Sequence, residues 1–203
     1  MNHSTLPFTP EEQSAIRLEF LHATRSPDYD ESRDWYDHFN YRHNSNIAVV
    51  GLESLASESM PTLHGILGKL NAAKGLELSH FQMFVCRPHH AGMYHTDGVD
   101  RKASFNVPIF NCEVGGIDWT QDDPPGAYRF ESEFTTNMRT EERDLPTIDH
   151  MVLDSIKLLR VDTWHRINNL NNPNHRVVFS LRFRGNPSFE TVLNAFNSDW
   201  RSK

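Results

Sequence analysis

The sequence lacks long apolar runs. The longest apolar stretches of this 203-residue chain, such as Ile47 to Leu52, are far shorter than the roughly 20 residues that a membrane-spanning helix needs. The first residues, Met1 to Pro7, also lack the basic end and apolar core of a secretory signal peptide. We therefore expect no membrane partner and a cytoplasmic location.

Positive charge is also scarce. The chain has 20 Lys and Arg residues against 27 Asp and Glu residues, which gives a formal net charge of -7 at pH 7. A protein that binds nucleic acid mainly through its phosphates needs clustered basic residues. This charge balance therefore argues against a nucleic-acid partner.

Cysteine is nearly absent, since Cys86 and Cys112 are the only two. Nothing in their spacing indicates a zinc site or a redox pair. We expect two reduced, buried thiols, which are typical of a cytoplasmic protein.

The overall composition is ordinary for a soluble globular protein, with 37% hydrophobic and 23% charged residues. The length suits a single domain over residues 1–203, and no repeat or low-complexity tract divides it. Within this domain we expect a helical support region over residues 1–77, a β core over 78–185 and a C-terminal helix over 186–203.

Helix signals occur at both ends of the chain. Thr9 to Glu12 form a capping box with proline at the first helical position, which predicts a helix from Pro10 to Ala23. Apolar residues on one face predict a second helix from Met60 to Lys74 that stops at Gly75. Ser188 is expected to cap a short helix that reaches Phe196. Residues 26–46 are expected to be irregular.

Strand signals dominate the middle of the chain. Helices that lead into many short strands favour a mainly β fold, a barrel or jelly roll with helices packed outside. Residues 111–150 resemble insertion loops that could cover a site. The expected strands are Leu78 to Cys86, Met93 to Asp97, Ala103 to Phe110, Ala127 to Glu133, Ser155 to Leu159, Thr163 to Asn168 and Val177 to Phe183.

Three residues in this β region have the chemistry of a metal site. His95 and Asp97 are two apart, so on a strand their side chains project to the same side. With His165 they form a 2-His-1-carboxylate set, which leaves three coordination positions of non-haem Fe(II) open. The short motif alone could arise by chance among 12 His and 27 acidic residues. The ordered set is stronger evidence, because a barrel brings an early and a late strand around one centre.

A basic residue follows the third ligand candidate. Arg176 opens the last apolar strand, and Ser180 and Arg182 share its parity, so all three can face the barrel interior. A guanidinium inside a barrel needs an anionic partner, and a carboxylate held through two hydrogen bonds would satisfy it. Arg182 competes with Arg176 for this role, and we prefer Arg176 by position. Asn106 could bind a ligand from the interior, although a structural amide is at least as plausible.

His175 is the main rival to His165 as the third ligand. It closes an Asn-rich loop, whereas His165 lies in a strand-like run. If His175 were the ligand, Arg182 would follow it by seven positions, whereas Arg176 follows His165 by eleven.

The pattern of His95, Asp97, His165 and Arg176 resembles the Fe(II)/2-oxoglutarate-dependent oxygenases, over about residues 80–185. The detail is similar to the aspartyl/asparaginyl hydroxylase-like or proline hydroxylase-like branch. One departure is that Ser180 lies four residues after Arg176, where many members have R-x-S, so the second group that binds the distal carboxylate is open.

This resemblance implies a double-stranded β-helix, a jelly-roll or cupin-like barrel, that uses Fe(II), 2-oxoglutarate and O2. The reaction would hydroxylate a C–H bond of a small molecule, amino acid or peptide side chain and release succinate and CO2. Asp97 favours hydroxylation, because family members that halogenate carry a small residue at that position. The alternative is a cupin-type metal-binding barrel that senses small carboxylates without turnover or without 2-oxoglutarate. The sequence favours no particular oligomeric state.

Overall fold

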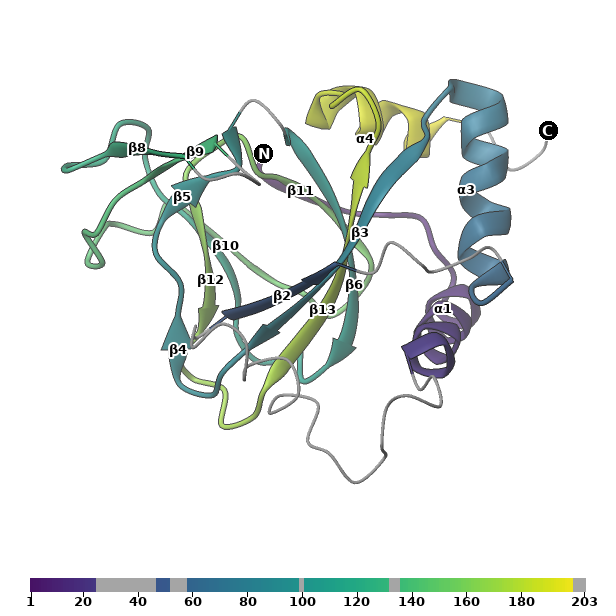
Figure 1. Cartoon of the computed structure of the whole chain (residues 1–203), viewed down its shortest axis with the longest axis horizontal. Helices are drawn as coiled ribbons and strands as arrows, with labels where there is room; N and C mark the ends of the chain where they lie inside the picture. The colour runs from purple at the N-terminus through teal and green to yellow at the C-terminus, as the bar shows by residue number, and fades with distance from the viewer. Residues whose placement is uncertain (25–46, 52–57, 99–100, 132–135, 199–203) are drawn as a thin grey trace.

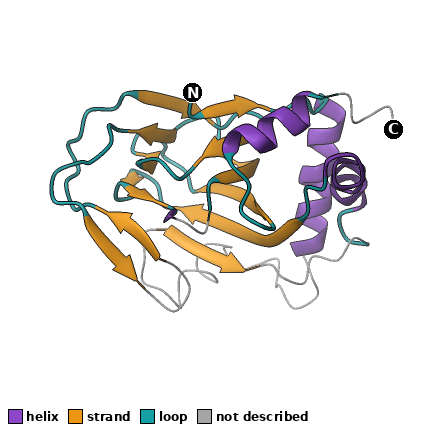
Figure 2. Cartoon of the chain, turned by 90° about the horizontal axis from the view of Figure 1, so that it is seen from above, coloured by secondary structure: helices purple, strands orange, loops and turns teal. Residues whose placement is uncertain are grey.

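Two antiparallel sheets face each other, and the helices pack on the outer side of one of them (Figures 1 and 2). This computed structural model describes residues 1–24, 47–51, 58–98, 101–131 and 136–198. The predicted architecture, mainly β with flanking helices, is confirmed. Within the described residues, no helix combines the length and the apolar character needed to cross a membrane.

The first sheet has six strands in the order β1-β11-β6-β13-β3-β2. Its central strands, β3, β6 and β13, match the predicted ranges to within one residue. The residues before position 78 also add edge strands to this sheet, besides the predicted helices. The strands are β1 (His3–Thr5), β2 (Ile47–Gly51), β3 (Leu78–Cys86), β6 (Ala103–Phe110), β11 (Lys157–Arg160) and β13 (Arg176–Phe183).

The second sheet has the strand order β10-β7-β12-β5-β9-β8, and β4 pairs with β12 beside this path. Several of its strands come from residues 111–150. One of them, β8, lies inside the predicted strand Ala127 to Glu133, but β7, β9 and β10 lie where insertion loops were expected, so that part of the prediction was wrong. These strands are only four residues long, and their sequences carry little periodicity. The strands are β4 (His90–Ala91), β5 (His95–Thr96), β7 (Gly116–Trp119), β8 (Tyr128–Glu131), β9 (Thr136–Arg139), β10 (Asp149–Val152) and β12 (His165–Asn169).

The helices begin and end where the sequence predicts, within about one residue. They are α1 (Pro10–Thr24), α3 (Pro61–Lys74) and α4 (Phe189–Asn197). The capping box of α1 is formed, because the Glu12 amide donates to Thr9 Oγ1 at 3.2 Å and the Thr9 amide donates to Glu12 Oε2 at 2.8 Å. Gly75 ends α3 in the left-handed region. The predicted irregular segment, residues 26–46, lies outside the described residues.

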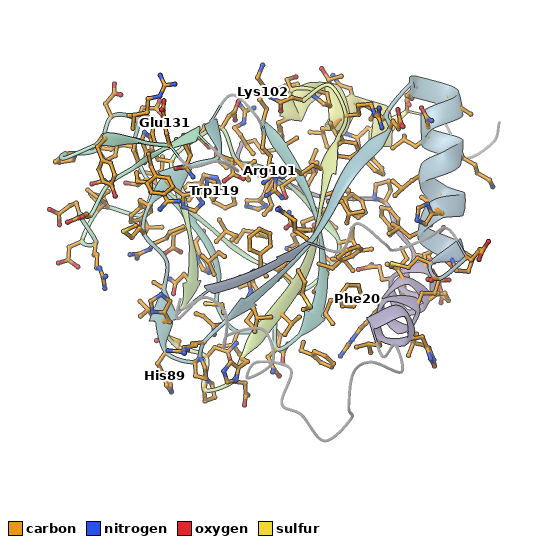
Figure 3. All side chains as sticks on the ribbon, in the orientation of Figure 1. Phe20, His89, Arg101, Lys102, Trp119 and Glu131 are labelled. Atoms are coloured by element: carbon orange, nitrogen blue, oxygen red, sulfur yellow. The ribbon has the colours of Figure 1, made fainter. Side chains whose placement is uncertain are left out.

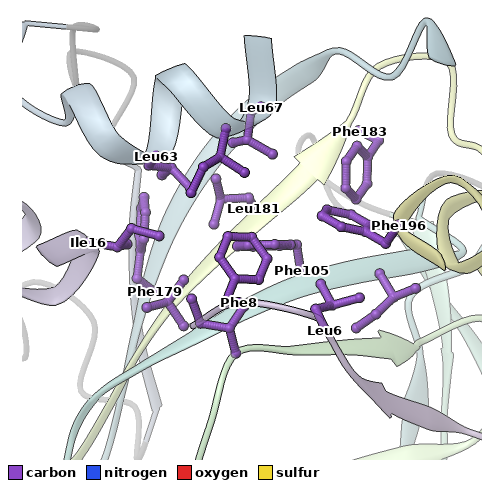
Figure 4. Packing of buried hydrophobic residues seen from close by; sticks show 14 of the residues in the cluster. Leu6, Phe8, Ile16, Leu63, Leu67, Phe105, Phe179, Leu181, Phe183 and Phe196 are labelled. Carbon is purple, nitrogen blue, oxygen red and sulfur yellow. The ribbon is translucent and has the colours of Figure 1, made fainter. Parts of the chain in front are cut away.

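Strand β13 separates two compartments. Its odd-numbered residues, such as Phe179 and Leu181, are buried against the helices in the main hydrophobic core (Figure 4). Its even-numbered residues Arg176, Val178 and Ser180 face the second sheet and line a cavity. The period-two alternation of a strand accounts for both faces. The core against the helices stabilises the strand, while the other face carries the polar side chains Arg176 and Ser180 together with Val178, which packs in a second, smaller hydrophobic cluster.

Candidate metal centre and its cavity

His95, Asp97 and His165 meet between the two sheets. Each offers one ligand atom, and these atoms all lie within 4.8 Å of one another. His95 opens β5, Asp97 directly follows that strand, and His165 opens β12 opposite His95 in the antiparallel register. Directly opposed residues of antiparallel strands share a face. The two imidazoles therefore lie on the same side of the sheet, with their ring centroids 4.5 Å apart.

Backbone carbonyls orient both imidazoles. His95 Nδ1 lies 3.0 Å from the Met93 carbonyl oxygen, and His165 Nδ1 lies 2.8 Å from that of Thr163. A carbonyl only accepts hydrogen bonds, so each Nδ1 carries the proton. Each Nε2 then keeps a lone pair that can bind a metal.

His165 is held in the neutral form that a metal requires. Its burial, together with the nearby His95, lowers the pKa of His165 to about 4. A neutral imidazole is the metal-binding form, so no proton has to be removed from His165 at neutral pH.

Asp97 is fixed by its own backbone and by two charged or polar neighbours. Its amide donates to the Val161 carbonyl oxygen at 2.7 Å. Its Oδ1 lies 3.4 Å from His95 Nε2, and its Oδ2 lies 3.3 Å from Arg101 Nη1. Burial acts to raise the pKa of Asp97, but the Arg101 charge and the histidines outweigh it and hold the pKa below its ordinary value. The carboxylate is therefore ionised, as a metal ligand must be.

Arg101 is a functional residue that the sequence analysis missed. It is 5% exposed and lies between the sheets (Figure 3). Besides its contact with Asp97, it donates to the hydroxyls of Ser104 and Ser180. Burial lowers the pKa of Arg101 to about 10, and it stays a cation at neutral pH. In the sequence it is a single Arg before an apolar strand, a pattern that does not distinguish it from a surface residue.

A small cavity of about 70 Å³ joins the three ligand candidates to two arginines. Both sheets contribute to its wall. It is lined by Phe84, His95, Asp97, Arg101, Ser104, Asn106, Ile117, Leu159, Val161, His165, Ile167, Arg176, Val178 and Ser180.

Arg176 is a buried cation that no carboxylate in the described part of the chain compensates. It is 2% exposed, and its Nε has no hydrogen-bond partner. Its charge lies near the thiols of Cys86 and Cys112, which are both free and buried as predicted. Among the described residues no Asp or Glu forms an ion pair with Arg176. A buried cation without a counter-ion is energetically costly, so this position is suited to binding an external anion.

The other candidate residues fall into two groups. Ser180 and Asn106 line the cavity, and the Asn106 side chain donates to Ser104 Oγ at 2.8 Å. Arg182 does not line it, although its charge is close enough to help lower the pKa of Arg101. His175 lies outside the cluster of ligand atoms, and its carbonyl accepts a hydrogen bond from Asn111.

Comparison with known proteins supports the fold. No family model matches the chain, and no curated protein matches it in sequence. Solved structures do match. The epimerase SnoN in complex with Fe3+, alpha ketoglutarate and nogalamycin RO is 14% identical with a TM-score of 0.51, over 90% of this chain and 78% of SnoN.

Two further structures match to the same extent. HygX from Streptomyces hygroscopicus, with nickel and 2-oxoglutarate bound, is 12% identical with a TM-score of 0.51, over 89% of this chain and 80% of HygX. The non-heme alpha ketoglutarate dependent carbocyclase SnoK is 13% identical with a TM-score of 0.51, over 90% of this chain and 79% of SnoK. The chain has the double-stranded β-helix fold of these structures, which confirms the fold class predicted from the sequence.

Proposed function

We propose that this protein is an Fe(II)- and 2-oxoglutarate-dependent dioxygenase that hydroxylates a C–H bond of a small molecule, amino acid or peptide side chain. The observation that carries this proposal is the position of Arg176. This buried cation, which no carboxylate of the described residues pairs with, lines the same cavity as His95, Asp97 and His165. A metal site alone would not need it, whereas a dicarboxylate bound to the metal would.

The residues present fit Fe(II). Two imidazole Nε2 atoms and one ionised carboxylate form the donor set of a facial triad, which leaves positions for a co-substrate and O2. Bound together with 2-oxoglutarate, the iron supplies the activation of O2 that oxidises a substrate C–H bond, with release of succinate and CO2. The SnoN and HygX structures, which hold this co-substrate with a metal in the same fold, support this choice of ligand.

In this proposal Arg176 binds the distal carboxylate of 2-oxoglutarate through its planar guanidinium. Ser180 adds a hydroxyl from the same face of β13, and Asn106 adds an amide from β6. The apolar side chains of Ile117 and Val178 exclude water from the space between, which strengthens the charge pairing.

Among the reactions that this fold supports, we propose hydroxylation. The similar structures include an epimerase and a carbocyclase, so the fold alone leaves the reaction open. Asp97 favours hydroxylation over halogenation, because its carboxylate fills the coordination position that a halide would need. The proposed substrate is a small molecule or peptide rather than nucleic acid or a membrane component, in keeping with the net charge of -7.

Anaerobic addition of Fe(II) followed by 2-oxoglutarate tests this proposal. The intact protein should develop the weak visible charge-transfer band of a keto acid chelated to iron, and admission of O2 should produce succinate. Asp97→Ala should show neither. A metal-binding protein without the band would point to the cupin alternative, and a band without succinate would point to the sensor.

A further inference from the structure

A row of side chains crosses the second sheet through the metal centre. The register pairs Trp119 with His165, His165 with His95, His95 with Arg139, and Arg139 with Tyr128. Directly opposed residues of antiparallel strands share a face. Since His95 and His165 face the cavity, Arg139 and Tyr128 emerge on that same face.

The hairpin of β8 and β9 therefore borders the metal site. Its strand β9 is hydrogen-bonded to β5, which carries His95 (Figure 1). Opposed residues on neighbouring antiparallel strands have Cα atoms roughly 5 Å apart. The Cα atom of Arg139 consequently lies one strand away from that of His95.

The guanidinium of Arg139 is held in place, and none of the described residues neutralises its charge. Its Cζ lies 3.5 Å from the centroid of the Phe130 ring, and its Nε donates to Asn137 Oδ1 at 3.0 Å. Stacking on an aromatic face fixes the plane of a guanidinium. In the part of the chain that the structure describes, no carboxylate pairs with Arg139. Its terminal nitrogens are therefore suited to an external carboxylate.

The other face of the same hairpin shows the opposite arrangement. Arg129 points away from the cavity face, and its Nε lies 2.6 Å from Glu131 Oε1. Both side chains are well exposed, at 68% for Arg129 and 61% for Glu131. The arginine of the hairpin that is neutralised within the chain is thus the one remote from the metal site.

We propose that Arg139, oriented by Phe130 and Asn137, binds a carboxylate of the primary substrate beside the metal centre. This inference rests on the proposed function and narrows its substrate class to a small molecule with a free carboxylate. Because Arg139 and His95 lie on neighbouring strands, the carboxylate and the oxidised carbon fit within the length of one amino-acid-sized molecule.

Binding of matched probe pairs tests this assignment. The protein is loaded with Zn(II) and saturating 2-oxoglutarate, so that a probe carboxylate cannot occupy the site at Arg176. The probes are benzoylglycine, N-acetylphenylalanine and 3-phenylpropionate, each compared with its carboxamide by ligand-observed NMR. The wild type should prefer the carboxylate of at least one pair, and Arg139→Gln should bind that carboxylate more than about tenfold more weakly.

Two variants serve as controls. Arg129→Gln removes the same charge from the outer face of the hairpin and should leave probe affinity within about twofold, as expected for a surface substitution. Arg139→Lys keeps the charge without the planar fork and should bind the probe with intermediate affinity. Affinity for 2-oxoglutarate, measured separately, should be unchanged in all three variants.

The possible failures are distinguishable. No preference for a carboxylate in any pair, or equal binding by wild type and Arg139→Gln, would overturn the substrate subsite while 2-oxoglutarate still binds. Failure of the wild type to bind 2-oxoglutarate would overturn the proposed function instead. Equal probe losses in Arg129→Gln and Arg139→Gln would also overturn the subsite, because they would indicate a general charge effect.

Discussion

Arg101 Nη1 lies 3.3 Å from Oδ2 of Asp97, the residue four positions earlier in the chain. The carboxylate of the candidate triad therefore has a counter-ion supplied by the protein itself. A bound metal would add a second positive charge to the same carboxylate. The stability of the metal-free protein and its response to metal should consequently depend on Arg101.

Replacing Arg101 with Met should destabilise the metal-free protein by about 3 kcal/mol, because the Asp97 carboxylate stays in a shielded site without its cation. Saturating Zn(II) should raise the melting temperature more in this variant than in the wild type, since the metal restores the missing charge. Thermal unfolding with and without Zn(II) measures both effects. Arg184→Met, which breaks an exposed ion pair with Glu77, should cost less than about 1 kcal/mol. Equal Zn(II)-induced shifts in wild type and Arg101→Met would contradict the counter-ion role.

Arg176→Leu should weaken 2-oxoglutarate binding while metal affinity stays near that of the wild type. Loss of a charge-assisted pair in a shielded site typically costs about 2–5 kcal/mol, so affinity should fall by more than about tenfold. Titration of the iron-loaded protein with 2-oxoglutarate, followed by the charge-transfer band, measures this. Arg182→Leu is the matched control, and a larger loss in that variant would assign the anchor to Arg182.

His165→Ala should abolish tight metal binding, whereas His175→Ala should retain it. His165 contributes one of the three clustered ligand atoms, and His175 lies outside that cluster. Anaerobic Fe(II) affinity and succinate formation without added substrate give two independent measurements. The reverse pattern would show that the triad is misassigned and would remove the argument for Arg176.

The thiol of Cys86 should be inert in the folded protein. Burial raises the pKa of Cys86 to about 11, although the charge of Arg176 opposes the rise. The folded pKa exceeds the unfolded one, so the stabilisation is complete below about pH 9 and is lost as the pH rises toward 11. Iodoacetamide at pH 8 should modify Cys86 only after denaturation. Between pH 9 and 11 the wild type should lose more free energy of unfolding than Cys86→Ala does, and rapid labelling of the native protein would contradict this prediction.

Two glycines should respond to alanine in opposite directions. A Cβ at Gly116 would overlap the Met151 carbonyl on the paired strand β10, so Gly116→Ala should destabilise the protein. A Cβ at Gly65, inside α3, would have no heavy atom within 4 Å. Gly65→Ala should therefore stabilise the protein by roughly 0.8–1 kcal/mol through helix propensity. Denaturant unfolding measures both changes, and a neutral Gly116→Ala would show that β7 and β10 can separate at little cost.

The sequence predicted those parts of the fold whose signals are local. The helices follow from the capping box at Thr9, the glycine stop at position 75 and the cap at Ser188. Strand β13 is eight residues long, so its alternation correctly separated Arg176 and Ser180 from the helix-facing residues.

The parts that were missed depend on partners distant in the sequence. Asp118 resembles a surface residue, yet it is buried in β7 because His150, Arg166 and Asn168 all donate hydrogen bonds to its carboxylate. In the sequence alone, where these partners cannot be identified, the four residues of β7 resemble a loop. Arg101 has two partners nearby in the sequence, Asp97 and Ser104, but its third partner, Ser180, lies 79 residues later in β13. The sequence does not show that the two sheets enclose Arg101, so its burial was missed.

The alternation along β13 has a consequence for how this protein can change. Substitutions at positions 177, 179, 181 and 183 alter the hydrophobic core and should reduce the amount of folded protein. Substitutions at positions 176, 178 and 180 alter the cavity wall and should change ligand preference in protein that still folds. A library randomised at positions 176, 178 and 180 would therefore sample changes in binding, whereas a library at positions 177, 179, 181 and 183 would mainly change the abundance of folded protein.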